Sequence, residues 1–189
     1  MNNRLLLIID PQIDFITGAL PVPDAEKAMD ALAEYLLRNN HDYTHIIVTA
    51  DSHPMHHCSF RSEGGEWPAH CVADSVGAAI WPAIMDRLLE CPDKVTVLHK
   101  GEDALTEEYS IFKNKDAAER ILAIVESKNI GRTDICGLAG DVCVADTIRD
   151  WMNIGVKSGL NVLKEFTPSI DGGAVLDSLI SKYGLSCVR

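Results

Sequence analysis

Long apolar runs and positive charge are both scarce in this sequence. The first apolar run has only five residues between Arg4 and Asp10, too few for a membrane span or the core of a signal peptide. Lys and Arg total 17 against 28 Asp and Glu, giving a net charge of -11 and a pI near 4.9. Such a chain repels nucleic acid and anionic lipid. We therefore expect a cytoplasmic protein with a small-molecule ligand and no nucleic-acid or membrane partner, and leave homo-oligomerisation open.

A regular cysteine pattern is absent as well. The six cysteines are irregularly spaced, which excludes a small secreted disulfide scaffold and predicts free thiols in a reducing compartment. Cys91, Cys136 and Cys187 are predicted to be inert core residues. The chain has no linker, repeat or low-complexity tract, and its 189 residues suit one hydrophobic core. We expect residues 1–189 to form a single domain.

Short apolar runs alternate with helical patterns along the chain. The apolar runs, which predict strands, are residues 4–9, 45–49, 95–98, 134–138, 156–163 and 185–188. Apolar residues at helical spacing predict helices near residues 25–36, 118–125, 144–152 and 176–183. This alternation predicts an α/β fold: a three-layer α/β/α sandwich around a mostly parallel sheet of about six strands. Residues 51–82 follow neither period, and a loop of that length is usually functional.

Three chemically active residues follow predicted strands. Asp10 and Lys100 end their runs, and Cys143 follows a glycine turn at a strand-to-helix junction. The carboxyl ends of parallel strands meet at one edge, so these side chains should converge. Lys100 and the helix terminus would lower the pKa of the thiol, and Asp10 would take its proton and return it to a leaving amine. His99 should point to the opposite face from its neighbour Lys100. The combination predicts an enzyme with a cysteine nucleophile.

Residues 51–72 contain a group of nitrogen and oxygen ligands. Asp51 and His53 are two residues apart, so on extended chain they share one face and can bind one ion. The other ligand candidates in this stretch are His57, Glu63 and His70. Such ligands suit zinc, iron or manganese, and the lack of a thiolate pair argues against a closed structural zinc site. An open metal site that orients substrate or takes part in catalysis is expected.

Six segments follow one another along the chain between residues 8 and 147. In order they are IIDPQIDF, TADSHP followed by SF, WPAHCV, HKG, YSIF and GLAGDVCV. Together they resemble the isochorismatase-like cysteine hydrolases, specifically the nicotinamidase (pyrazinamidase) branch. The resemblance implies a catalytic triad of Asp10, Lys100 and Cys143. It also implies one divalent metal ion per chain, with zinc the first choice and iron or manganese as alternatives.

The same resemblance implies a set of metal ligands. Asp51, His53 and His70 are three of them, and the fourth is either Glu63 or His57. We favour Glu63, because its oxygen complements the other three ligands and the surrounding glycines let it turn inward.

The resemblance further implies an oxyanion hole and a substrate pocket. A cis peptide before Ala139 would aim the N–H groups of Ala139 and Cys143 at one point. The pocket would be lined by Phe15, Trp67, Tyr109, Leu138 and Val142, whose aromatic members would hold a flat ring. Val142 replaces an aromatic or histidine residue, and Gly140 a threonine, found in relatives. We therefore expect a roomier or less polar pocket on that side.

The implied reaction is deamidation of nicotinamide to nicotinate and ammonia through a thioester on Cys143, with pyrazinamide as a second substrate. The alternative enzyme is a sister hydrolase acting on isochorismate, a ureido compound or another linear amide. The non-enzymatic alternative is a metabolite-binding module. It is disfavoured because DPQIDF, rather than a glycine fingerprint, follows the first strand.

Overall fold

A single parallel sheet forms the middle layer of the protein. The computed structural model describes residues 3–188, in which six strands have the order β3-β2-β1-β4-β5-β6 and every neighbouring pair is parallel. The strands are β1 (Asn3–Ile9), β2 (His45–Asp51), β3 (Val95–Lys100), β4 (Ile130–Gly137), β5 (Gly159–Leu163) and β6 (Ser186–Val188).

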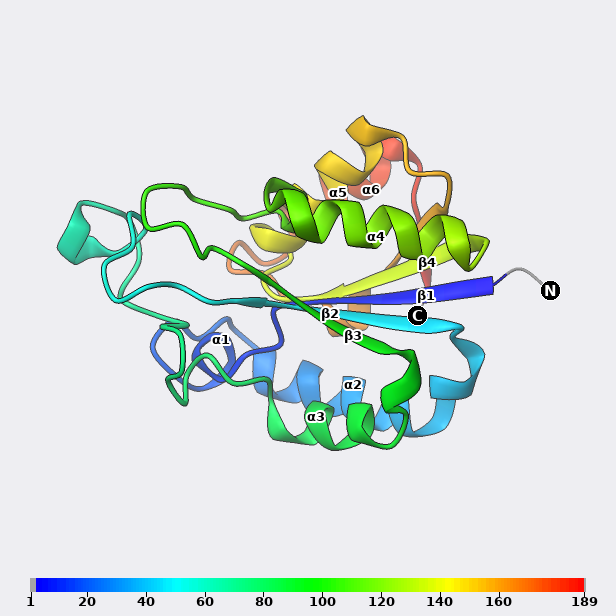
Figure 1. The fold of residues 1–189 in the computed structure, drawn as a ribbon, viewed down its shortest axis with the longest axis horizontal. Helices are drawn as coiled ribbons and strands as arrows, with labels where there is room; N and C mark the ends of the chain where they lie inside the picture. Colours follow the sequence, from blue (N-terminus) through cyan, green and yellow to red (C-terminus); the bar gives the residue numbers. More distant parts are fainter. Residues whose placement is uncertain (1–2, 189) are drawn as a thin grey trace.

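Helices cover both faces of this sheet (Figure 1). On one face lie α1 (Ile13–Ile16), α2 (Ala25–Asn39) and α3 (Pro82–Leu89); on the other lie α4 (Lys115–Ser127), α5 (Cys143–Ile154) and α6 (Ala174–Tyr183). The predicted three-layer α/β/α sandwich is confirmed. Within residues 3–188, none of the helices combines the length and the apolar content needed to cross a membrane.

The two helical layers explain why the first strand is apolar throughout. Leu6 and Ile8 pack with the α2 and α3 layer, whereas Leu5, Leu7 and Ile9 pack with the α4 and α5 layer, and all five are fully buried. Side chains of a strand alternate between faces, so a strand covered on both sides needs apolar residues at every position.

The strand order places a crevice beside β1. From β1 the chain adds β2 and β3 on one side, and then crosses over to add β4, β5 and β6 on the other. Ligands of open α/β sheets bind at the carboxyl ends of the strands, where the order reverses. The ends of β1 and β4 flank this point, so residues following Ile9 and Gly137 face the crevice.

One helix and the burial of two cysteines differ from the sequence expectation. No helix was predicted at α3, which starts at Pro82 and buries only Ile84 and Leu88, too short a stripe to give a periodic signal. The core prediction is wrong for Cys187, which is exposed because its strand β6 is at the edge of the sheet. Cys91 is half-buried, and Cys136 is fully buried as expected.

Candidate functional site

Asp10 is the first residue beyond β1, and β2 holds it in place. Its φ of 46° lies in the left-handed region, which aspartate tolerates better than most residues. The backbone N–H of Asp10 donates to the carbonyl oxygen of Thr49 at 3.1 Å, and the Thr49 hydroxyl donates to Asp10 Oδ1 at 2.6 Å. Sequence reasoning missed Thr49; its hydroxyl inside an otherwise apolar strand was the available signal.

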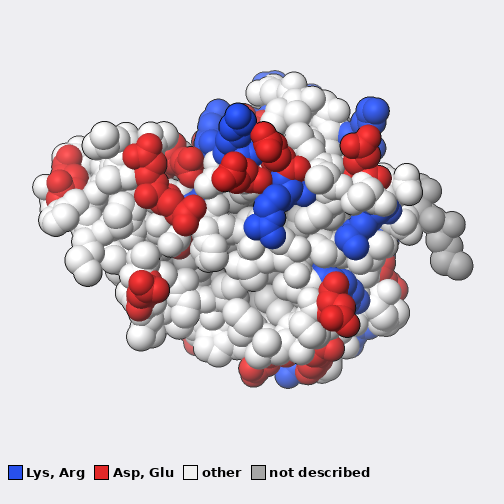
Figure 2. All heavy atoms as spheres, in the orientation of Figure 1, with Lys and Arg blue, Asp and Glu red and all other residues white. Residues whose placement is uncertain are grey.

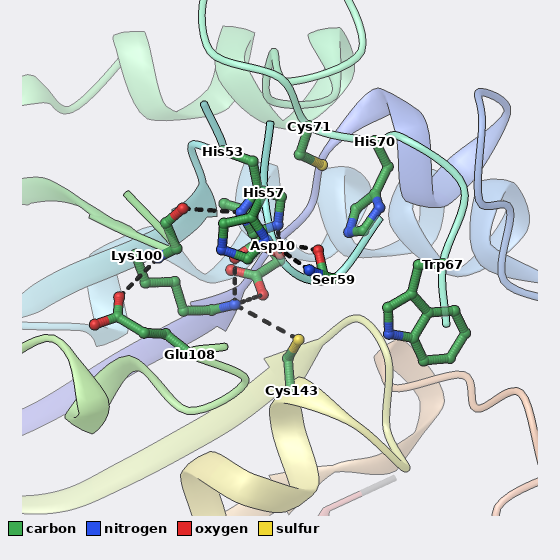
Figure 3. A network of polar contacts seen from close by, with 12 residues as sticks. Asp10, His53, His57, Ser59, Trp67, His70, Cys71, Lys100, Glu108 and Cys143 are labelled. Atoms are coloured by element: carbon green, nitrogen blue, oxygen red, sulfur yellow. Dashed lines mark hydrogen bonds and ion pairs between the residues drawn. The ribbon is translucent and has the colours of Figure 1, made fainter. Parts of the chain in front are cut away.

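Lys100 ends β3 with its side chain buried in the crevice, whereas its neighbour His99 is exposed, as predicted. The Lys100 ammonium lies 2.5 Å from Asp51 Oδ1, 3.0 Å from Asp10 Oδ2 and 3.6 Å from Cys143 Sγ (Figure 3). Burial by itself lowers the pKa of Lys100, but the two carboxylates raise it well above its ordinary value. The lysine is therefore a permanent cation in this site.

Cys143 is the first residue of α5, and its thiol faces Lys100 and Asp10. Burial raises the pKa of the Cys143 thiol well above its ordinary value; Lys100 opposes this shift, while Asp10 and Asp51 add to it. The expected lowering of the thiol pKa is not found, because one ammonium does not outweigh burial and two carboxylates. If Cys143 acts as a nucleophile, its proton must therefore be removed as the sulfur attacks.

Asp10 is placed to remove that proton. Its carboxylate is fully buried, and burial raises the pKa of Asp10 although Lys100 lowers it in part, which makes the carboxylate a stronger base. Asp10 Oδ2 forms an ion pair with the Lys100 ammonium at 3.0 Å and, within residues 3–188, accepts no further hydrogen bond, which leaves a lone pair for the thiol proton. The structure therefore brings all three predicted catalytic residues to one point.

Asp51, His53 and His70 form a second cluster beside the first. One ligand atom from each lies within 4.8 Å of the others, and all three side chains are buried. Nδ1 of His53 contacts the carbonyl oxygen of Gly101 at 2.9 Å, and Nδ1 of His70 contacts that of Pro68 at 2.8 Å. A carbonyl only accepts, so both Nδ1 atoms carry the proton and both Nε2 lone pairs are free to bind a metal.

The charge state of these histidines also suits metal binding. Burial lowers the pKa of His53 to about 3 and lowers that of His70, so both rings are neutral. Gly101 is required beside them: its φ is +70°, and a Cβ there would lie 2.4 Å from His53 Cε1. Two neutral imidazoles and a carboxylate are a donor set for zinc, iron or manganese, so the residues fit the implied ion.

The two candidates for a fourth ligand lie in different surroundings. Glu63 is not brought to the cluster; it lies in the outer loop, where its carboxylate contacts the exposed His56 at 3.0 Å. His57 is buried and stacks on His53 with 4.0 Å between ring centroids, and its ring nitrogens contact Ser59 Oγ and the carbonyl oxygen of Thr106. The geometry therefore does not favour Glu63, and His57 would reach the cluster by giving up one of its hydrogen bonds.

The turn between β4 and α5 presents two unused donors. The peptide bond between Leu138 and Ala139 is cis, as expected. In the described part of the chain, the backbone N–H groups of Ala139 and Cys143 donate to no protein acceptor. Both border the crevice, so they are available to an oxyanion formed over Cys143.

A pocket opens directly onto Cys143. Four of the five predicted substrate-binding residues line it, and Trp67 Nε1 donates to the Tyr109 hydroxyl at 3.0 Å. Leu138 does not line the pocket; it is fully buried in the core beneath. The complete lining is Phe15, Leu20, Val22, Asp51, Trp67, His70, Glu107, Tyr109, Ala139, Val142, Cys143 and Ile170.

Sequence reasoning missed Glu107 in the pocket, and Gly140 lies outside the lining. Burial raises the pKa of Glu107 to about 7, so this pocket carboxyl changes charge near neutral pH. Gly140 does not line the pocket: a Cβ there would lie 2.3 Å from Ser169 Oγ. This glycine makes room for a neighbouring segment of chain, and of the two substituted positions only Val142 lines the pocket.

Comparison with known proteins agrees with this geometry. The isochorismatase domain model matches residues 4–160. The nicotinamidase of Escherichia coli is 30% identical over 183 residues, covering 87% of this chain and 83% of the relative. The nicotinamidase/pyrazinamidase of Mycobacterium tuberculosis is 30% identical over 181 residues, covering 93% and 92%. The structure of a Pyrococcus horikoshii pyrazinamidase in complex with zinc aligns with a TM-score of 0.84 and 29% identity over 99% of both chains.

The family match spans most of the chain and includes every strand of the crevice. The chain therefore belongs to the isochorismatase family, on the branch of its nicotinamidase and pyrazinamidase relatives.

Proposed function

We propose that this protein is an amidohydrolase that converts nicotinamide to nicotinate and ammonia through a thioester on Cys143. The single observation that carries the proposal is the meeting of Asp10, Lys100 and Cys143 beside two unused backbone donors, in a pocket with aromatic walls. The relatives with 30% identity named as nicotinamidases support nicotinamide as the substrate.

The first chemical step uses the buried triad. The substrate ring lies between Phe15 and Trp67, with its carboxamide over Cys143. Asp10 takes the thiol proton as sulfur attacks the carbonyl carbon, and Lys100 stabilises the negative charge that forms on sulfur. The oxyanion accepts hydrogen bonds from the N–H groups of Ala139 and Cys143, each of which is worth about 3–4 kcal/mol in comparable sites.

The second half of the reaction reverses the proton transfer. Asp10 donates its proton to the departing ammonia, which leaves a thioester on Cys143. Asp10 then takes a proton from the water molecule that attacks the thioester and passes it to the sulfur as the C–S bond breaks. This regenerates the thiol and the Asp10 carboxylate, and the acid product leaves as nicotinate after losing its proton to solvent. Because Asp10 is the general base in both halves, its burial and raised pKa affect acylation and deacylation alike.

We also propose that Asp51, His53 and His70, with His57 as the fourth protein ligand in place of Glu63, bind one divalent ion, zinc in the first instance. When bound, the ion supplies a Lewis-acidic position that orients the ring nitrogen of the substrate, directly or through water. Pyrazinamide, which also carries a ring nitrogen and a carboxamide, is the expected second substrate.

Removal of the nucleophile tests the proposal directly. We expect Cys143→Ala to lower the rate of ammonia release from nicotinamide by at least about 10³-fold, because no other group can form the thioester. Cys136→Ala is the matched control, since Cys136 is buried in β4 away from the pocket and should retain most of the activity. Substantial turnover by Cys143→Ala would exclude the covalent route.

A comparison of substrates distinguishes the proposed nicotinamidase from a sister hydrolase of the same family. Ammonia release is measured from nicotinamide, pyrazinamide and an N-carbamoyl amino acid, each with and without chelator. Faster turnover of the N-carbamoyl compound would favour the sister reaction. The paired aromatic rings Trp67 and Tyr109 in the pocket favour the heteroaromatic amides.

A further inference from the structure

The loop from Ala139 to Cys143 carries both donors of the oxyanion hole, yet its internal hydrogen bonds are few. The N–H groups of Val142 and Val144 both donate to the carbonyl oxygen of Ala139 at 3.1 Å. These bonds close the turn upon itself, but they do not fix its direction relative to the pocket. The orientation of the two donors must therefore depend on contacts with another segment.

That segment is residues 167–171, which precede α6. Asp141 Oδ1 accepts a hydrogen bond from the Ile170 N–H, and Asp141 Oδ2 accepts one from the Asp171 N–H, both at 2.9 Å. The Gly140 N–H donates to the carbonyl oxygen of Pro168 at 2.8 Å. Three hydrogen bonds thus join the two segments, and one carboxylate accepts two of them.

The two segments are also in close steric contact. A Cβ at Gly140 would lie 2.3 Å from Ser169 Oγ and 3.0 Å from the carbonyl oxygen of Thr167, so only glycine fits without a shift. The Thr167 hydroxyl donates to the carbonyl oxygen of Leu163 at 2.9 Å, which ties residues 167–171 to the end of β5. The oxyanion loop is in this way braced against the sheet.

Residues 167–171 also shape the pocket. Ile170 lines it together with Ala139, Val142 and Cys143, whereas Asp141 does not. A change in the Asp141 contact would therefore move a wall of the pocket and the two oxyanion donors together, with no loss of a group that touches the substrate.

We propose that Asp141 is a positioning residue for the oxyanion hole: its carboxylate fastens residues 167–171 to the loop that carries the N–H groups of Ala139 and Cys143. The inference rests on the proposed amide hydrolysis at Cys143. It assigns Asp141 an effect on the transition state, where the oxyanion forms, larger than its effect on substrate binding.

Asp141→Asn tests this assignment. An asparagine offers one acceptor oxygen, and its NH₂ group would face the second backbone N–H, so one of the two bonds is lost. We expect kcat to fall about 10- to 100-fold, as for small misplacements in other active sites, with KM changing less than about threefold. The inhibition constant of nicotinaldehyde should rise in parallel with the loss of kcat. Nicotinaldehyde adds to the thiol: the S–H bond and the C=O π bond break, sulfur bonds to the carbonyl carbon, and the thiol proton moves by way of Asp10 to the former carbonyl oxygen, which lies at the oxyanion position.

Asp171→Asn is the matched control. The Asp171 carboxylate also accepts two backbone N–H groups, those of Gly173 and Val175 at 2.7 and 2.8 Å, and Asp171 belongs to the same segment. Its side chain makes no contact with residues 139–143 among the described hydrogen bonds, so we expect kcat within about twofold of wild type. Equal losses in both variants would overturn the positioning role, as would an unchanged kcat in folded Asp141→Asn.

A second variant and a comparison of substrates for the wild-type protein cover the cases in which Asp141→Asn alone gives no answer. If Asp141→Asn does not fold, Gly140→Ala separates the same two segments by steric contact, and an unchanged kcat there refutes the inference. If wild type hydrolyses pyrazinamide or an N-carbamoyl compound but not nicotinamide, nicotinamide is the wrong substrate, and the variants are compared on the amide that is hydrolysed. If wild type hydrolyses none of them, the proposed function and the role of Asp141 are both rejected.

Discussion

Lys100 supplies the positive charge that balances two buried carboxylates in the site. Its ammonium contacts Asp10 and Asp51 and lies 3.6 Å from the thiol of Cys143, and its side chain is only 1% exposed. Two buried carboxylates without this cation would repel each other and would be protonated more readily. The basicity of Asp10 and the stability of the crevice therefore depend on the same side chain.

Lys100→Met removes the charge and keeps a side chain of similar length. We expect the rate of nicotinamide deamidation to fall at least about 100-fold, because Asp10 becomes protonated and the charge on sulfur loses its partner. The free energy of unfolding in urea should fall by about 3–5 kcal/mol, the usual cost of leaving a buried charge unpaired. Lys115→Met, an exposed lysine, is the control. Wild-type turnover in Lys100→Met would contradict the assigned role.

Three substitutions in one loop distinguish between His57 and Glu63 as the proposed fourth metal ligand. We expect His57→Ala to lower the zinc content after dialysis, measured by elemental analysis, because a lost ligand weakens binding. Glu63→Gln and His56→Ala should keep their zinc, since Glu63 and His56 contact each other at the surface and not the cluster. Loss of zinc in Glu63→Gln with normal zinc in His57→Ala would restore Glu63 as the ligand.

At the scale of elements, a buried carboxylate in β4 links neighbouring strands of the sheet through hydrogen bonds. Asp134 of β4 is fully buried and accepts hydrogen bonds from Arg4 of β1, Arg132 of β4, Asn161 of β5 and Tyr43, which precedes β2. Burial alone raises the pKa of Asp134, but these donors lower it below its ordinary value. This carboxylate therefore holds three neighbouring strands together.

Asp134→Asn should destabilise the protein without changing the chemistry. We expect a loss of about 3 kcal/mol in the free energy of unfolding at pH 7, because two arginines lose their buried partner. A depressed pKa contributes stability above the unfolded pKa of about 4 that is lost as the pH falls through the folded value. The difference from wild type should therefore shrink below about pH 4 in urea titrations. Asp177→Asn, in an exposed ion pair with Lys164, is the control; equal losses would refute the role of burial.

At the scale of the whole molecule, the excess of acidic side chains sets which partners are favourable. On the face shown in Figure 2, acidic side chains outnumber basic ones over the lobe at the left, which Figure 1 shows to contain the loops after β2 and β3. The net charge of -11 makes the average electrostatic potential around the molecule negative. Neutral amides can approach without the repulsion that phosphates and anionic lipids meet.

The charge predicts that the protein does not bind polyanions. We expect no shift of duplex DNA in gel electrophoresis and no sedimentation with vesicles containing anionic lipid, even at about 0.05 M salt, where electrostatic attraction is screened least. A basic protein of similar size is the positive control. Binding at low salt that disappears at high salt would reveal a basic surface that the overall charge conceals.

The sheet and the meeting of Asp10, Lys100 and Cys143 at its edge were predictable because they depend on local patterns. Apolar runs such as residues 4–9 mark strands that are buried on both faces, and a polar residue at the end of such a run faces the sheet edge. Helices with long apolar stripes, such as α2, were predictable for the same reason. In contrast, α3 buries two residues, and its position depends on packing against α2.

The sequence by itself determined the six strands and the helices with long apolar stripes, and it determined that Asp10, Lys100 and Cys143 follow predicted strands, because hydrophobic periodicity is a property of neighbouring residues. Only the tertiary structure decided which groups surround them. Three properties arise from segments far apart in the chain: the raised pKa of Cys143, the position of His57 rather than Glu63 beside His53, and the hydrogen bonds from residues 167–171 to Asp141. Burial and long-range contacts set these properties, and no local pattern encodes them.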